Sequence, residues 1–137
     1  MTERTTCAKA PCRSCPYRRD VPSGVWSAEE YDKLPAYDGE IVAQVEAKAG
    51  GLFMCHQQDG RICAGWLGCH GPGNLLAIRL ASFYEDRLDP AVFLYRSPVP
   101  LFASGAAASA HGKRALRRPG PRAKRMMAQL LRSRGRA

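Results

Sequence analysis

Six cysteines in a chain of 137 residues constrain the fold more than any other feature of the sequence. Two of them form a Cys12-x2-Cys15 turn that Pro16 follows, and two more lie at Cys55 and Cys63. A Cys-x2-Cys turn brings two sulfurs to one ion with little loop-closure cost, and thiolates are the ligands that select zinc or iron-sulfur clusters. We therefore predict that Cys12, Cys15, Cys55 and Cys63 are the ligands of one soft-metal site.

The second pair of cysteines is separated by seven residues that include Asp59-Gly60, a dipeptide typical of tight reversals. Such a reversal would return Cys63 toward Cys55. The alternative is that both are small buried apolar residues, as free cysteine often is. His56 is the substitute ligand that we consider, and its other role would be to support Cys55 without binding the metal.

The sequence favours a [4Fe-4S] cluster, with zinc as the alternative. Proline after a ligating cysteine is familiar in cluster-binding segments, and Tyr17, Phe53 and Trp66 could shield a cluster from solvent. A zinc ribbon or treble clef usually has two Cys-x2-Cys knuckles, whereas here the later pair, Cys55 and Cys63, is widely separated. Cys7 and the Cys69-His70 pair are treated as spare groups.

Positive charge is concentrated at the end of the chain. The net charge is +9, yet ten Lys or Arg residues and no acidic ones fall between Lys113 and Ala137, which leaves 11 basic and 12 acidic residues elsewhere. Such a run attracts polyanions by counterion release, and its alternative role is that of a solubilising extension. The expected nucleic-acid contacts are Lys113, Arg114, Arg117, Arg118, Arg122, Lys124, Arg125, Arg132, Arg134 and Arg136.

The pattern along the chain predicts an α+β fold: a small domain stapled by a metal or a cluster, with mostly short helices, one short hairpin and a basic helical tail. We divide it into a cysteine domain, 1–112, and a tail, 113–137. Capping and periodicity predict four helices in the first domain. The first starts at Ser27 with a Glu30 capping box, and the second runs from 39 or 40 to 49 with Asp38 as its cap. The third runs from Asn74 through Leu88, and the fourth starts at Ser104. The hairpin is expected over 52–56 and 61–66.

Pro121 suits the first position of a tail helix with an apolar stripe bordered by basic residues. The helix could dock on a partner protein, an acidic membrane surface or a nucleic-acid backbone, and the alternative is that its stripe packs on the body of the protein. The members of the stripe are Met126, Met127, Leu130 and Leu131.

Three motifs make the chain recognisable as similar to a known family. They are Cys12-x2-Cys15-Pro-Tyr-Arg-Arg-Asp, Phe53-Met-Cys-His56 and Cys63-Ala-Gly-Trp66, with a later Ser97-Pro-Val-Pro-Leu-Phe102. Together they resemble the domain of unknown function 6283 family, found in actinobacteria and their phages. The resemblance spans roughly 11–112 and leaves the tail outside it. It supports the ligand set and implies no established reaction.

Composition narrows the classes of function. No stretch approaches the roughly 18 apolar residues of a membrane span, and the first ten residues contain no apolar run, so we expect a cytoplasmic protein, in the host cytoplasm if it is phage-encoded. We predict a non-catalytic metal-binding protein whose tail associates with nucleic acid, with a regulatory role. The alternatives are a thiol or cluster-dependent redox enzyme, and a protein-interaction module that docks through the tail helix.

Overall fold

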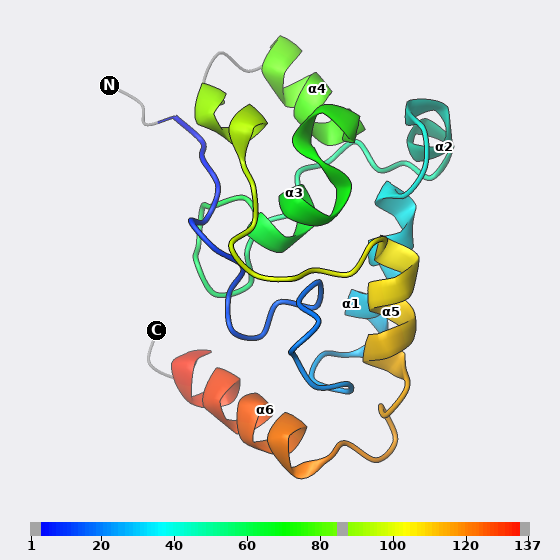
Figure 1. The fold of residues 1–137 in the computed structure, drawn as a ribbon, viewed down its shortest axis with the longest axis vertical. Helices are drawn as coiled ribbons and strands as arrows, with labels where there is room; N and C mark the ends of the chain where they lie inside the picture. Colours follow the sequence, from blue (N-terminus) through cyan, green and yellow to red (C-terminus); the bar gives the residue numbers. More distant parts are fainter. Residues whose placement is uncertain (1–3, 85–87, 135–137) are drawn as a thin grey trace.

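The structure is a computed structural model in which residues 4–84 and 88–134 are described. The described chain is mostly helical, and α4 and α6 lie at opposite ends of its long axis with α3 between them (Figure 1). Its α-helices are α1 Ala28–Asp32, α2 Ile41–Glu46, α3 Ala64–His70, α4 Leu76–Tyr84, α5 Gly105–Lys113 and α6 Pro121–Arg134. Its 3-10 helices are η1 Leu34–Tyr37, η2 Pro72–Asn74 and η3 Pro90–Leu94.

The predicted hairpin is reduced to a single bridge. Met54 pairs antiparallel with Ile62, and backbone bonds join Cys55 N to Arg61 O at 2.8 Å and Cys63 N to Phe53 O at 2.9 Å. The chain turns helical at Ala64, so the second strand predicted over 61–66 does not form. In the described residues, β structure is confined to isolated bridges of this kind.

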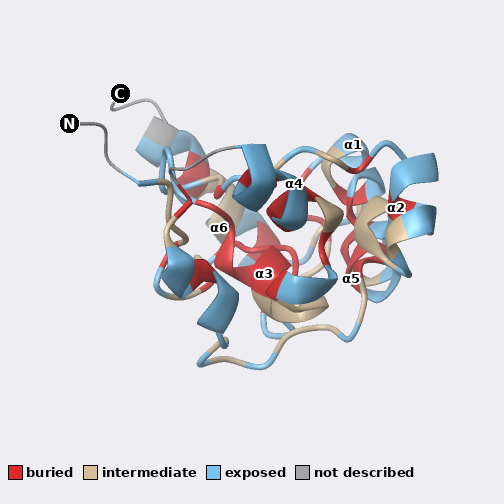
Figure 2. Ribbon diagram, turned by 90° about the horizontal axis from the view of Figure 1, so that it is seen from above, coloured by how far each residue is buried: buried red, intermediate tan, exposed pale blue. Residues whose placement is uncertain are grey.

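The core is centred on α3. All four residues of its first turn are buried, and Trp66 and Leu67 are fully enclosed (Figure 2). Tyr17, Ile62 and Leu75 surround them from other segments. Solvent-exposed surface covers the outer sides of α2, α4 and α6 (Figure 2). The core therefore holds together segments that precede and follow the cysteine motifs.

The capping box predicted at the first helix is not formed. Ser27 precedes α1, but its side chain makes no capping bond. The Glu30 carboxylate instead contacts His56 at 2.7 Å and Lys33 at 3.0 Å. The carboxylate that would have completed the capping box is thus engaged by a lysine three residues later and by a histidine from another segment, so these contacts override the local pattern.

Asp38 caps a helix other than the predicted one. Its two carboxylate oxygens accept from Gly105 N at 2.7 Å and Ala106 N at 2.8 Å, so it caps α5 together with Ser104, which accepts from Ala107 N. The Ser104 cap confirms the helix start predicted there, whereas Asp38 as cap of the earlier helix is wrong. α2 begins at Ile41.

The interior face of α2 is polar. Gln44 is fully buried, and its amide donates to Gly39 O and Asn74 O and accepts from Leu76 N at 2.9 Å. The amide thus replaces Asn74 as the N-terminal partner of α4, and the Asn74 cap predicted from sequence is wrong. The Gln44 side chain thus pairs with the carbonyl at the end of η2 and with the amide at the start of α4, two backbone groups that lack a partner within their own helices.

α4 is shorter than predicted. It ends at Tyr84, and Leu88, which was expected in its last turn, forms a parallel bridge with Thr5 instead. The pairing ties the start of the described chain to the segment before η3.

The tail helix packs on the body. α6 begins at Pro121 as predicted, Ala123 and Leu130 are buried in the common core, and Leu131 is 72% exposed. Of the predicted stripe, Met126 and Met127 are half-buried against that core. The core thus includes part of the segment that the sequence set apart as a tail.

Candidate metal centre

The four predicted ligand thiols lie in one continuous chain of contacts. Cys15 Sγ is 3.9 Å from Cys63 Sγ, although 48 residues separate them in sequence. The Cys12 thiol also interacts with both Cys15 and Cys55. The order of contact is therefore Cys55, Cys12, Cys15, Cys63, and it joins three separate segments.

The four thiols are not arranged as a finished metal site in the described residues. Within residues 4–84 and 88–134, no group of three or more His, Cys, Asp or Glu side chains is arranged to hold a metal ion. Closing the chain around an ion would need rotation of cysteine side chains between their staggered rotamers. The backbone positions already bring the sulfurs into one neighbourhood.

The Cys12-x2-Cys15 turn, here called the first knuckle, is held by local backbone hydrogen bonds and by one long-range hydrogen bond. Cys15 N donates to Cys12 O at 3.0 Å, and Arg18 N donates to Cys15 O at 3.1 Å. Between the cysteines, Ser14 is buried, and its carbonyl accepts from the Trp26 indole at 2.7 Å. The indole thereby fixes the turn that carries the first two sulfurs.

The second half of the site is set by the start of α3. Cys63 is its N-cap, and the Cys63 sulfur accepts from Trp66 N at 3.5 Å. A Cβ at Gly65 would strike the Cys15 sulfur, so only glycine lets α3 approach the first knuckle this closely. The Cys-Ala-Gly-Trp motif thus supplies a sulfur, a donor to it and the space for a second sulfur.

The thiols share negative charge unequally. Hydrogen bonds from Cys15 and from Cys55 lower the pKa of Cys12. The Cys12 interaction, the Cys63 interaction and burial raise the pKa of Cys15, and the Cys12 interaction and burial raise that of Cys55. The arrangement concentrates thiolate character on Cys12, which has the central position between its two donors.

The His56 side chain makes two contacts outside the four thiols. Its Nε2 lies 2.7 Å from Glu30 Oε2, and its ring packs against Trp26 at a centroid distance of 4.7 Å. Both contacts support the segment next to Cys55. The sequence could not reveal them, because Glu30 lies 26 residues away on α1.

The remaining cysteines lie outside the chain of four thiols. Cys7 is half-buried in a parallel bridge to Ile62, and burial raises its pKa. Cys69 is half-buried on α3, and burial followed by the nearby Asp38 charge raises its pKa to about 12. Neither thiol is activated as a nucleophile, because nucleophilic cysteines need a lowered pKa.

The basic residues of the tail whose side chains the structure describes are exposed. Lys113 pairs with Asp32, and Arg122 donates to Asp20 O at 3.1 Å. The loop before α6 is pinned where Ala115 N donates to Ser23 Oγ at 2.8 Å. Arg134 is the last residue of α6, and Arg136 lies outside the described residues. The exposed set is Lys113, Arg114, Arg117, Arg118, Arg122, Lys124, Arg125 and Arg132.

Fold and site together define a small, mostly helical protein built around a cluster of free cysteines. The chain belongs to the DUF6283 family, described as a family of unknown function, whose model matches residues 7–134. The match confirms the resemblance and extends it through α6, so the expectation that the tail lies outside the family is wrong. No curated protein and no solved structure matches the chain. None of the helices in the described ranges has the length and apolar character that crossing a membrane requires.

Proposed function

We propose that the protein binds a soft metal through Cys12, Cys15, Cys55 and Cys63 and associates with nucleic acid through its basic C-terminal segment. The observation that carries the first half is the chain of contacts among these thiols, with Cys15 and Cys63 sulfurs 3.9 Å apart. Four thiols gathered from separate segments without a disulfide are the donor set of structural zinc and cluster sites.

The 3.9 Å distance between the Cys15 and Cys63 sulfurs favours a single ion. Zinc bonds of about 2.3 Å in a tetrahedron place two sulfurs about 3.8 Å apart. In a [4Fe-4S] cluster each cysteine binds a different iron, which sets the sulfurs further apart. We therefore place zinc before the cluster that the sequence favours. The cluster is retained as the second candidate because aromatic Tyr17, Phe53 and Trp66 are all buried beside the thiol segments.

The bound metal would supply folding energy by joining three segments that share no extended sheet. Its holders would be the four cysteines, with Trp66 N donating to the Cys63 sulfur. Gly65 would keep space for Cys15. The support for a structural role is that the site lies in the core and not in an open pocket.

The nucleic-acid half rests on the ordered basic surface. Arg122, Arg125 and Arg132 are exposed on α6, and their spacing places them on one side of the helix. Ala123 and Leu130 are buried on the other side. No acidic residue lies between Lys113 and Ala137. A surface of this kind binds phosphate backbones electrostatically and without sequence preference.

Anaerobic purification followed by metal and acid-labile sulfide analysis tests the first half. About one zinc per chain without sulfide supports the structural ion, and iron with equal sulfide supports the cluster. A metal-free protein whose thiols cycle reversibly would favour the thiol redox enzyme instead. Titration of fluorescent duplex DNA and RNA at several salt concentrations tests the second half, and salt-independent binding would contradict it.

A further inference from the structure

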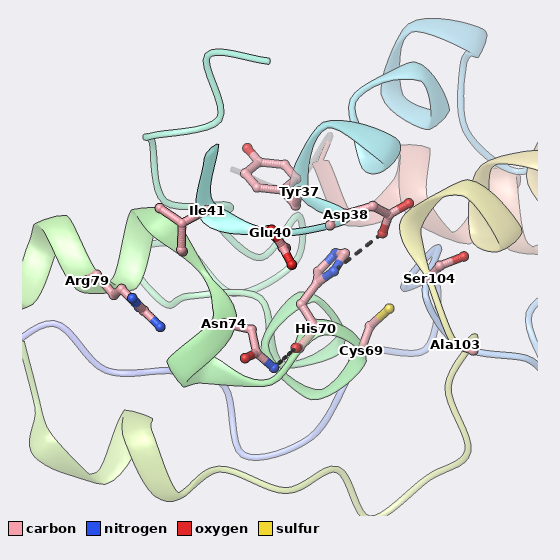
Figure 3. Close-up of a pocket in the computed structure, with 11 residues that line it drawn as sticks. Tyr37, Asp38, Glu40, Ile41, Cys69, His70, Asn74, Arg79, Ala103 and Ser104 are labelled. Carbon is pink, nitrogen blue, oxygen red and sulfur yellow. Dashed lines mark hydrogen bonds and ion pairs between the residues drawn. The ribbon is translucent and has the colours of Figure 1, made fainter. Parts of the chain in front are cut away.

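A cavity lies away from the four predicted ligand thiols, between the start of α2, the end of α3, α4 and the start of α5. Its volume is about 490 Å³, within the range of sites for small molecules. Figure 3 shows Arg79 at one end of this cavity and Asp38, Cys69 and Ser104 at the other, with His70 between them.

His70, at the middle of the cavity, is buried and contacts two neighbouring side chains. The His70 side chain is 6% exposed, its Nε2 lies 3.3 Å from the Tyr17 hydroxyl, and its Nδ1 lies 3.5 Å from Asp38. Burial lowers the pKa of His70, so the ring is neutral at pH 7. The Asp38 carboxylate is already compensated by the Gly105 and Ala106 amides of α5.

Two opposite charges, Arg79 and Glu40, also line the cavity. The Arg79 Nε donates to Gly73 O at 2.8 Å, which fixes the guanidinium and leaves its two terminal nitrogens available. The Glu40 side chain is exposed and lines the same cavity. Within the described residues, neither Arg79 nor Glu40 has an ion-pair partner.

The geometry points to a binding site for a small zwitterion, a free amino acid with an apolar side chain. Its carboxylate would pair with Arg79, which presents parallel donors suited to that group, and its ammonium would pair with Glu40. The apolar side chain would lie against Tyr37 and Ile41. A ligand with only a negative charge would be repelled by Glu40, and a ligand with only a positive charge would be repelled by Arg79, so a ligand with both charges is favoured. This site does not depend on metal binding.

Calorimetric titration of the full chain with L-leucine tests the proposal. N-acetyl-L-leucine lacks the ammonium and L-leucinamide lacks the carboxylate, so each should bind about tenfold or more weakly than L-leucine. Arg79→Gln and Glu40→Gln should each weaken L-leucine binding by a similar factor. Arg96→Gln and Glu46→Gln replace exposed side chains outside the cavity, so they are the matched controls and should leave L-leucine binding unchanged.

Both cavity variants replace exposed side chains, and an unchanged circular dichroism melt will show that they are folded. Absence of L-leucine binding at millimolar concentration would overturn the proposal. Equal binding of the two derivatives, or an unchanged affinity in both variants, would overturn it as well. None of these results would alter the metal content of the protein, so the thiol site is tested separately.

Discussion

Replacing Gly65 with alanine should impair metal binding more than folding. The added Cβ would strike the Cys15 sulfur and lie 3.1 Å from the Tyr17 Cβ, and both neighbours are fully buried. The first knuckle or the start of α3 must therefore move. Either shift changes the position of Cys15 relative to Cys63, which is the closest sulfur pair of the site.

The two effects of Gly65→Ala differ in size. Overpacking costs about 1 to 3 kcal/mol, and the helix preference of alanine over glycine returns about 1 kcal/mol, so the metal-free protein should lose about 0 to 2 kcal/mol. Disturbing the surroundings of a metal ligand lowers affinity about 10- to 100-fold. That factor corresponds to about 1.4 to 2.7 kcal/mol, which only the metal-loaded protein would lose in addition.

Urea unfolding with and without a zinc chelator, alongside a competition titration for zinc, measures both quantities. Gly112→Ala is the matched control, because its Cβ would strike the Tyr31 ring, in the core but away from the thiols. It should destabilise the loaded and the stripped protein equally. The reasoning is refuted if Gly65→Ala leaves zinc affinity unchanged, or if Gly112→Ala lowers it as much.

Three further predictions concern α6 and His70, which lines the cavity described above. Arg122→Gln with Arg125→Gln should lower the slope of log affinity for DNA against log salt by about two, and an unchanged slope would place the phosphate contacts elsewhere. Leu130→Ala should lower the free energy of unfolding in urea by about 2 kcal/mol, and Leu131→Ala by less than about 0.5 kcal/mol, because only Leu130 is buried. Equal losses in the two variants would contradict the packing of α6. Burial lowers the pKa of His70 below its ordinary 6.5, so the unfolded chain binds the proton more tightly and stability should fall as the pH drops below about 6.5. His70→Asn should flatten that loss in unfolding measured at a series of pH values, and an unaltered pH dependence would show that His70 does not cause it.

Local signals in the sequence identified several elements correctly. Ser104 caps α5 and Pro121 starts α6 as predicted, because capping and the fixed φ of proline act over a few residues. The Cys-x2-Cys knuckle is also local. These features depend on no contact that the rest of the fold must supply.

Features set by tertiary contact were not accessible from the sequence. Asp38 sits where a cap for the next helix is expected, yet it caps a helix 67 residues later. Gln44 is a polar residue among exposed valines, and its burial depends on backbone groups of α4. Gly65 carried a usable signal, because a glycine inside the strand predicted over 61–66 suggests a close backbone approach, but its partner Cys15 could not be identified from the spacing.

The most direct test of the thiol site is the metal content of single cysteine variants after anaerobic purification. Cys12→Ser, which removes the thiol that contacts both Cys15 and Cys55, should abolish stoichiometric metal. Cys69→Ser is the matched control, because it removes a half-buried thiol outside the chain of four, and this variant should retain stoichiometric metal. Equal metal content in both variants, or none in the unaltered protein, would contradict the account.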